Sequence, residues 1–192
     1  GCLMELLVQN LCKAYGGKVV LINVSFTAGP GVTCVMAPSG GGKTTLLRLL
    51  LGLEAPDSGR IFGAENVRWS ALFQENRLLE QLSAAENIRF VLGPLYDPAA
   101  ALALLEALGL GEECQRPVRD FSGGMKRRAA LARALLAPCD ALALDEPFTG
   151  LDGENRLRAM ACIQKYGAGK PVLLVTHQSL DGAELNAQMV TL

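Results

Sequence analysis

The chain has 192 residues, of which half are hydrophobic, and its formal net charge is −1. This length supports one domain with a sizeable hydrophobic core. The near-neutral charge excludes the basic surplus of a nucleic-acid-binding domain, and no apolar stretch approaches the roughly 18 residues that a membrane-spanning helix needs.

The first part of the chain alternates between apolar runs and turns. Residues 32–36 lead directly into a glycine-rich turn at 37–45, and the leucine-rich run 46–51 behind this turn predicts a helix. The apolar runs predict strands near residues 5–9, 20–27, 32–37 and 59–62.

The glycine-rich turn has the arrangement that a triphosphate needs. Glycines let backbone N–H groups close around phosphate oxygens, and a helix N-terminus adds donors and the positive end of its dipole. Lys43 is placed to reach the β- and γ-phosphates, and the Thr44 hydroxyl is placed to ligate Mg²⁺. Glycine usually opens such a motif, whereas this chain has Ala37, which disfavours a positive φ. The alternative is a turn with a solvated lysine. The candidate phosphate-binding residues are Ser39, Gly40, Gly41, Gly42, Lys43, Thr44 and Thr45.

The middle of the chain, roughly residues 75–136, predicts mostly helices. A strand-like run at 67–72 precedes it and leads into Gln74. The apolar helix predicted at 99–108 is too short to span a bilayer. Further on, Ser122 is a good N-cap for an Ala/Leu/Arg-rich helix, and the two glycines after it can make a second anion site. A simple capped helix is the alternative.

Acidic residues follow a buried strand in the last third of the chain. The apolar run 141–144 is typical of a strand covered on both faces of a parallel sheet, and Asp145 and Glu146 come directly after it. Ligands of open α/β sheets bind at the carboxyl ends of such strands. Asp145 is placed to hold Mg²⁺, usually through water, and Glu146 to polarise an attacking water. An exposed acidic turn is the alternative.

Two more strands are predicted at 172–176, which ends at the single histidine His177, and at 188–192. The six cysteines show no metal-ligand spacing, so we expect buried reduced thiols, which fit the cytosol. Met4 is a candidate for the native start, with the nativeness of residues 1–3 left open, and we expect neither a signal peptide nor a C-terminal regulatory domain.

The order of these motifs resembles that of the ATP-binding cassette (ABC) ATPases. The family signature is usually L-S-G-G-Q, and residues 121–125 read F-S-G-G-M, so Met125 replaces the glutamine. The resemblance implies an α/β fold, with a P-loop NTPase core sheet, an antiparallel β edge and an inserted helical subdomain. It implies a single ABC ATPase domain over 1–192, with its core at 1–74 and 137–192 and the helical subdomain at about 75–136.

The resemblance also implies roles for individual residues. Tyr15 resembles the adenine-stacking aromatic, with Val20 packed below it. Gln74 resembles the glutamine that reaches Mg²⁺ and the attacking water, and His177 resembles the histidine that contacts the γ-phosphate. Asp152 resembles the aspartate that crosses to the other subunit of a dimer. The residues implied to grip ATP from that other subunit are Ser122, Gly123 and Gly124.

The implied activity is ATP hydrolysis with Mg²⁺ in a head-to-tail homodimer that ATP holds together. The implied partners are a transmembrane permease subunit and, in the full system, a solute-binding protein. The implied location is cytoplasmic, on the inner face of the cell membrane. The implied catalytic residues are Lys43, Gln74, Glu146 and His177, and the implied Mg²⁺ ligands are Thr44, Gln74 and Asp145.

The segment after the glutamine resembles importers of the nitrate, sulfonate, taurine and thiamine-precursor type, although Glu80 and Gln81 replace the usual Pro-Trp. We expect residues 75–88 to dock the membrane subunit through exposed leucines, namely Leu78, Leu79 and Leu82. The alternative is that these leucines pack the helical subdomain. A small exporter cassette for haem or lipoproteins and a non-transport ABC ATPase acting on DNA or ribosomes are the alternative functions.

Overall fold

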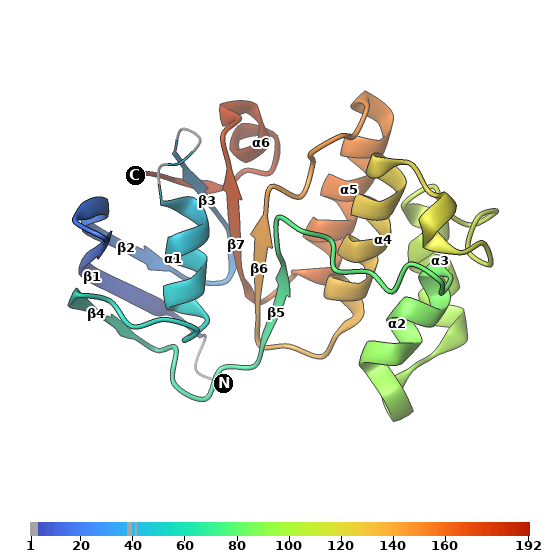
Figure 1. Ribbon diagram of the computed structural model, residues 1–192, viewed down its shortest axis with the longest axis horizontal. Helices are drawn as coiled ribbons and strands as arrows, with labels where there is room; N and C mark the ends of the chain where they lie inside the picture. The colour runs from blue at the N-terminus through green and yellow to red at the C-terminus, as the bar shows by residue number, and fades with distance from the viewer. Residues whose placement is uncertain (1–3, 38–39, 41) are drawn as a thin grey trace. The chain divides into compact units, whose positions relative to one another are not determined.

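The computed structural model describes residues 4–37, 40 and 42–192 (Figure 1). The chain forms two compact units. The first unit contains residues 1–71, 139–146 and 167–192, and the second contains residues 72–138 and 147–166. This grouping places 147–166 with the helical segment, whereas the sequence suggested that it belongs with the core.

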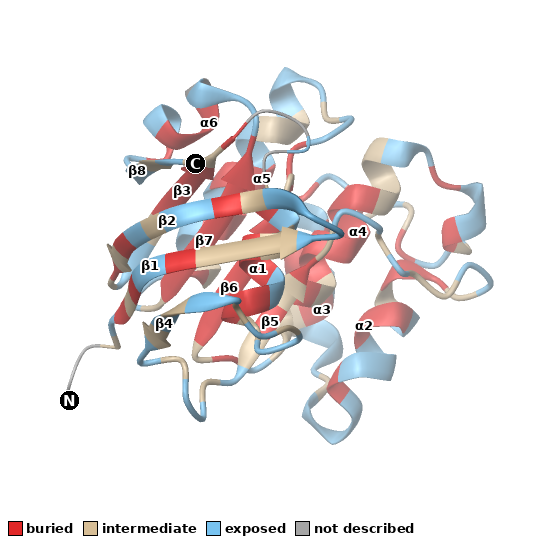
Figure 2. Ribbon diagram, turned by 60° about the vertical axis from the view of Figure 1, so that its left-hand side comes forward, coloured by how far each residue is buried: buried red, intermediate tan, exposed pale blue. Residues whose placement is uncertain are grey.

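A five-stranded sheet forms the centre of the first unit, in the order β5-β6-β7-β3-β8. The pairs β6–β7, β7–β3 and β3–β8 are parallel. Every residue of β6 and β7 is buried (Figure 2), as their continuous apolar runs predicted. The strands are β3 (Gly31–Met36), β5 (Trp69–Leu72), β6 (Ala141–Asp145), β7 (Pro171–Thr176) and β8 (Gln188–Thr191).

Helix α1 (Lys43–Leu50) follows β3 through the glycine-rich turn and packs against β6, β7 and β2. Its leucines are its buried face, and they join one hydrophobic cluster with β1, β2, β3, β6 and β7. A short helix, α6 (Ser179–Glu184), lies against β3. The turn, which begins after β3 and ends at α1, is therefore held between two well-packed elements.

The second sheet of this unit is antiparallel, in the order β2-β1-β4. Its strands are β1 (Leu6–Tyr15), β2 (Lys18–Ala28) and β4 (Ser58–Phe62). Strand β1 runs six residues beyond the predicted 5–9, because the register shifts between Val8 and Leu11 and Asn10 takes a φ of 48°. This bulge turns Leu11 into the core after Leu6 and Val8, so strict alternation is lost while burial continues.

The second unit is mainly helical. Ser83 and Glu86 form a capping box at the start of α2, and the Ser122 hydroxyl accepts from the Met125 N–H at 3.2 Å, which confirms the predicted cap of α4. Helix α5 packs on α3 and α4, which explains why residues 147–166 group here. The elements are α2 (Ala84–Leu92), η1 (Gly93–Leu95), α3 (Pro98–Ala107), η2 (Val118–Asp120), α4 (Gly123–Leu136) and α5 (Gly153–Tyr166).

The leucines that we expected on the surface of this unit are only partly exposed. The Asn87 side chain holds the backbone of Leu79 from both sides, because its Oδ1 accepts from the Leu79 N–H at 2.8 Å and its amide donates to the Leu79 carbonyl at 3.1 Å. Leu78, Leu79 and Leu82 are all intermediate in burial, so they are less exposed than we expected, and their role in docking stays a prediction. Over the described residues, the helices are all too short or too polar to cross a bilayer.

Candidate active site

Four of the predicted site residues meet at one edge of the parallel sheet. Lys43 and Thr44 begin α1 just after β3, Asp145 ends β6, and His177 follows β7. Strands β3, β7 and β6 are neighbours and parallel, so their carboxyl ends lie together. This is the edge at which open α/β sheets bind ligands.

Lys43, Glu146 and His177 form one hydrogen-bonded group. The Lys43 Nζ donates to Glu146 Oε1 at 2.7 Å, and His177 Nδ1 lies 2.9 Å from the same oxygen. The Lys43 and Glu146 side chains are only 9% and 13% exposed, whereas His177 is half exposed. A buried ammonium beside a carboxylate and an imidazole can neutralise phosphate charge and orient a water within the same few ångströms.

The carboxyl of Glu146 stays ionised in this setting. Burial alone raises its pKa, but the hydrogen bonds from Lys43 and His177 more than offset burial, so the pKa of Glu146 lies below its usual value. With Glu146 ionised, the shared geometry requires His177 Nδ1 to carry its proton and donate. Glu146 can therefore accept a proton from an attacking water at neutral pH.

The backbone of Glu146 adopts a left-handed conformation that non-glycine residues rarely take, with a φ of 48°. Its N–H donates to the Val175 carbonyl at 2.8 Å, which ties the residue to the neighbouring strand β7. Strained backbone of this kind persists only where the surrounding structure fixes it, and it is common at active sites. In this backbone conformation the Glu146 carboxylate reaches both Lys43 and His177.

The loop that carries His177 is fixed by a buried threonine and aspartate. The Thr176 hydroxyl donates to Asp181 Oδ2 at 2.7 Å and accepts from the Gln178 N–H at 3.1 Å. Thr176 and Asp181 are both almost fully buried. These bonds hold the backbone on both sides of His177, and we did not anticipate either residue from the sequence, because neither belongs to a recognisable motif.

Two oxygen donors approach each other beside Lys43. The Thr44 hydroxyl donates to Asp145 Oδ2 at 2.9 Å, and Asp145 is buried. A hydroxyl and a carboxylate are ligands that Mg²⁺ accepts, and Mg²⁺ commonly takes only one or two protein ligands with water and phosphate oxygens. Within the described residues, histidines, cysteines and carboxylates do not cluster in threes as an all-protein metal site would require. The residues present fit a magnesium ion shared with a phosphate ligand.

The glycine-rich turn needs glycine at position 42 for two reasons. Gly42 has a φ of 85°, and a Cβ there would lie 2.5 Å from the Val20 carbonyl oxygen. Gly40 also has a positive φ, of 79°. Ala37 is buried and does not belong to the described residues with a positive φ, so a methyl group fits where the motif usually has glycine. The predicted residues Ser39 and Gly41 lie outside the described residues.

Tyr15 lies at the end of β1 and is 43% exposed. Its hydroxyl donates to Glu54, and Lys13 Nζ lies 5.3 Å from the ring centroid. Hydrogen bonding to the Glu54 carboxylate is the main cause that raises the pKa of Tyr15. Val20 is partly buried on β2. A ring fixed at its edge and open to solvent suits base stacking. We did not anticipate the partners Glu54 and Lys13, because no motif marks them.

The remaining predicted residues belong to the second unit. Gln74 is exposed in the segment between β5 and α2. Ser122 caps α4, and Gly123 and Gly124 open that helix. A Cβ on Gly124 would lie 2.7 Å from the Gly150 carbonyl oxygen, so the signature and the 149–152 segment touch.

Asp152 is engaged within its own segment. Its carboxylate accepts from the Asn155 N–H at 2.9 Å and from the Asn155 side-chain amide at 3.2 Å, which caps the start of α5. Any contact of Asp152 with a second subunit would compete with this cap.

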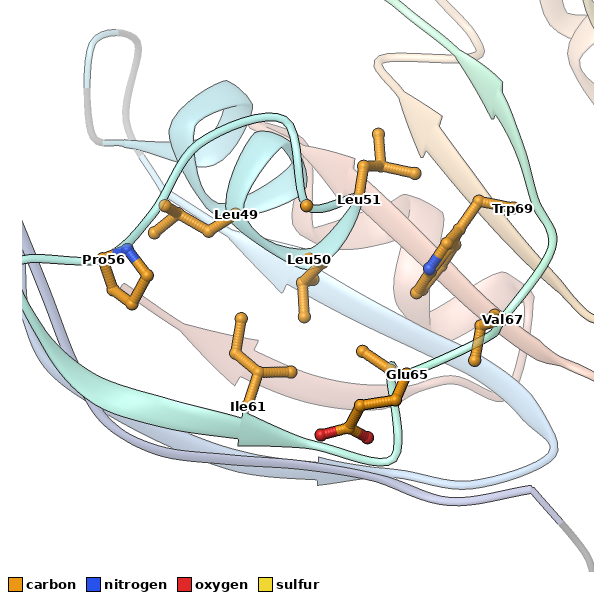
Figure 3. A pocket seen from close by; sticks show the side chains of 10 residues that line it. Leu49, Leu50, Leu51, Pro56, Ile61, Glu65, Val67 and Trp69 are labelled. Atoms are coloured by element: carbon orange, nitrogen blue, oxygen red, sulfur yellow. The ribbon is translucent and has the colours of Figure 1, made fainter.

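A separate apolar pocket of about 340 Å³ lies at the other end of α1 (Figure 3). Leu50 of α1 and Ile61 of β4 point toward each other across it, and Trp69 closes one side. Among the described residues that line it, Glu65 is the charged one and it is acidic, so the pocket does not suit a triphosphate. The charged and polar side chains that suit a triphosphate lie instead at the N-terminus of α1.

Sequence comparison places the chain among proteins of one family. The ABC transporter family model matches residues 21–149. The chain is 41% identical over 186 residues to the aliphatic sulfonates import ATP-binding protein SsuB 3 of Pseudomonas syringae pv. tomato, a match that covers 91% of this chain and 67% of that protein. It is 38% identical over 154 residues to SsuB 2 of Burkholderia lata, covering 76% of this chain and 56% of that protein.

A third relative, SsuB 1 of Paracoccus denitrificans, is 36% identical over 187 residues, covering 95% of this chain and 76% of that protein. The chain therefore spans between 56% and 76% of the length of these three relatives. A solved structure from Pyrococcus furiosus, named as an ABC transporter ATP-binding protein, superposes with a TM-score of 0.87 over 98% of this chain and 97% of that one, at 21% identity. At that identity the likeness concerns the fold, and it confirms the predicted fold class.

Proposed function

The chain belongs to the ABC transporter family as an ATP-binding subunit, and from that membership we propose that it hydrolyses ATP to drive import of a solute through a partner permease. The observation that carries this proposal is the meeting of Lys43, Glu146 and His177 at the N-terminus of α1. A module that only binds nucleotide has no need of a strained, ionised glutamate beside a histidine.

Each group at the site has a task in phosphoryl transfer. Lys43 and the α1 N-terminus balance the charge on the β- and γ-phosphates. Thr44 and Asp145 would hold Mg²⁺, which would neutralise the charge that develops on the phosphate oxygens. Glu146 accepts the proton of the attacking water and orients it, and His177 contacts the γ-phosphate. A phosphate at Lys43 competes with the Glu146 carboxylate for one ammonium, and that competition releases Glu146 toward the water.

The second unit supplies the groups that complete ATP sites in a head-to-tail dimer. Ser122 and Gly124 stand at the N-terminus of a 14-residue helix, where backbone N–H groups and the helix dipole favour an anion. In the proposed dimer these groups face the γ-phosphate bound by the other copy. Hydrolysis removes the shared anion, and the two copies separate.

The proposed partner on the membrane side is a permease subunit, whose docking surface on this chain lies on the second unit. The α2 patch, defined as Phe90 and Val91 of α2 together with Leu95 of the following η1, carries apolar side chains that are 72%, 52% and 67% exposed. Apolar side chains gathered in this way mark interaction surfaces, and a helix of a membrane subunit is the proposed occupant. The chain would thus work at the inner face of the membrane, with a solute-binding protein as part of the system.

The relatives from Pseudomonas, Burkholderia and Paracoccus are named for the import of aliphatic sulfonates, so a small organic sulfonate is the first solute to test. The test has two stages. First, the purified chain is assayed for phosphate release from ATP with and without Mg²⁺. Second, the chain is reconstituted in vesicles with the permease encoded beside it, and uptake of a labelled sulfonate is measured. Failure to release phosphate in either preparation would reject the proposed activity, and export of solute would favour the exporter alternative.

A further inference from the structure

The segment that carries Gln74 has little regular structure of its own. Residues 73–82 belong neither to a strand nor to a helix. Backbone carbonyls in such a segment need partners from elsewhere, because a buried carbonyl without a hydrogen bond is costly. Two arginines of α4 supply those partners.

Arg127 lies under the first part of the segment. It is 4% exposed, and its Nη1 donates to the Phe73 carbonyl at 2.6 Å, to the Gln74 carbonyl at 3.4 Å and to Asn76 Oδ1 at 2.9 Å. A guanidinium is planar and has several donors in a fixed fork, so it can hold several oxygens in one geometry. Arg127 therefore fixes the backbone on both sides of the Gln74 side chain.

Arg133 extends the same arrangement. Its Nη2 donates to the Asn76 carbonyl at 2.6 Å, and its Nη1 donates to the Arg77 carbonyl at 2.7 Å. Arg77 takes a φ of 49°, and its guanidinium stacks 4.6 Å from the centre of the Phe73 ring. Arg127 and Arg133 together thus hold the carbonyls of four residues, Phe73, Gln74, Asn76 and Arg77.

Helix α4, which provides these arginines, also begins with Ser122 and Gly124. Its first turns therefore carry both the signature residues and Arg127, which holds the glutamine segment. Lys126, one residue before Arg127, pairs with Glu80 at 2.9 Å and ties the far part of the segment to the same helix. The glutamine segment and the signature are therefore joined through side chains of one rigid element.

We infer that Arg127 and Arg133 are positioning residues that set the place of Gln74 and make the glutamine segment move with the signature helix. The inference rests on the proposed function, because Gln74 matters only if the chain hydrolyses ATP. Neither arginine needs to touch nucleotide. Each acts on the reaction through the backbone of residues 73–77.

The test compares Arg127→Gln with Arg127→Lys, which keeps the charge but lacks the fork, and with Asn76→Ala, which removes one acceptor without leaving a buried carbonyl unpaired. The control is Arg116→Gln, which changes an arginine of the same unit that pairs with Glu113 instead. Hydrogen exchange is measured first, on the chain without nucleotide. We expect the Leu79 and Leu82 amides to exchange roughly 10-fold faster in Arg127→Gln, with the α2 amides unchanged.

Steady-state ATPase assays then report on Gln74. For Arg127→Gln we expect kcat to fall by roughly 10- to 100-fold, with KM for ATP within about 3-fold and a higher Mg²⁺ concentration for half-maximal rate. Arg127→Lys should recover part of the loss, and Arg116→Gln should behave as the unaltered chain.

A double-mutant cycle separates positioning from general support of the fold. In a Gln74→Ala background, Arg127→Gln should lower kcat by no more than about 3-fold, because its effect passes through Gln74. Additive losses would overturn the inference, as would unchanged exchange at Leu79 and Leu82 in a folded Arg127→Gln variant. If Arg127→Gln does not fold, Asn76→Ala enters the same cycle with the same criteria. An unaltered chain that releases no phosphate would refute the proposed function, while the exchange comparison would still decide whether the arginines hold the segment.

Discussion

Lys43 and Glu146 are 103 positions apart in the chain, and the Lys43 Nζ lies 2.7 Å from the Glu146 Oε1 in a nearly buried ion pair. The two groups have opposite relations to a triphosphate, because the ammonium attracts it and the carboxylate repels it. The pair therefore links nucleotide affinity to the state of the group that orients water. The effect on nucleotide affinity and the effect on the hydrolysis rate can each be measured.

Lys43→Ala should weaken ATP binding by about 2–5 kcal/mol, roughly 30-fold or more in Kd. The loss has two causes, since the variant lacks the phosphate-binding ammonium and leaves the negative charge of the Glu146 carboxylate facing the phosphates without the ammonium that offsets it. Adding Glu146→Gln to Lys43→Ala should therefore restore part of the affinity. Isothermal titration would measure both variants, with Lys170→Ala as a control because Lys170 precedes β7 at the opposite edge of the sheet. Unchanged affinity in Lys43→Ala would remove the phosphate-loop assignment.

Glu146→Gln alone should keep ATP binding and lower the hydrolysis rate by roughly 100-fold or more, because an amide cannot accept a proton from water. The variant should dimerise with ATP and not with ADP, which light scattering would detect. A monomer under both nucleotides at high protein concentration would count against the proposed dimer. An unchanged hydrolysis rate would refute the role of Glu146. The proposed dimer would then still be tested by the light-scattering result.

Tyr15→Ala should weaken nucleotide binding by roughly 1–3 kcal/mol, the usual worth of one stacked base. Tyr15→Phe keeps the ring and loses only the hydroxyl that donates to Glu54, so it should bind nearly as well as the unaltered chain. Stacking does not depend on the identity of the base, so GTP should compete with ATP in the same titrations. Equal affinities for Tyr15→Ala and the unaltered chain would show that Tyr15 does not stack on the base and has a structural role.

The side chains that meet at the sheet edge could be named from the sequence because their signals are local. The glycines directly precede Lys43, and the apolar run 141–144 directly precedes Asp145. The Ser122 cap of α4 in the second unit was predictable for the same reason. The glycine requirement at Gly42 adds a contact that no pattern contains, namely the Val20 carbonyl that lies against it. Nothing in the local sequence indicates that contact, because Val20 lies on β2 of the antiparallel sheet, whereas Gly42 follows β3 of the parallel sheet.

The longer-range features could not be read from periodicity. The bulge at Asn10 interrupts the alternation of β1 and hides the strand beyond position 9. Leu79 was expected at the surface because charged residues surround it in sequence, but Asn87 pins its backbone and the side chain is half-buried. Nothing in the sequence marked Arg127 and Arg133 of α4 as buried partners of another segment, yet both donate to carbonyls more than 50 positions away. Hydrogen bonds between such distant positions depend on the fold, so the spacing of residues in the sequence does not predict them.

The pair of Arg68 and Asp140 predicts a pH dependence of stability. Asp140 accepts from the Arg68 side chain at 3.0 and 3.2 Å and from its backbone N–H at 2.9 Å, and these bonds lower the pKa of Asp140 to about 2. A carboxyl whose folded pKa is depressed stabilises the fold above its unfolded pKa of about 3.9 and loses that effect as the pH falls. Asp140→Asn should therefore unfold at lower urea than the unaltered chain at pH 6, and the gap should close between about pH 4 and pH 2. High salt should narrow the gap at pH 6, since the pair is partly exposed. A gap that stays constant across this range would show that the ionised carboxylate is not the cause.

The last prediction concerns the permease. Phe90 is 72% exposed while its neighbours Asn87, Ile88 and Leu92 form the buried face of α2, so Phe90→Asp removes little from the core. It should leave the melting temperature and the ATPase rate of the isolated chain nearly unchanged, and it should abolish co-purification with the permease encoded nearby. Phe62→Asp is the matched control, because it changes an exposed phenylalanine of β4 in the other unit and should not affect assembly. Leu79→Asp serves as the contrast, since its half-buried side chain predicts a loss of stability before any loss of partner. A Phe90→Asp variant that still assembles and supports uptake would exclude the α2 patch as the docking surface.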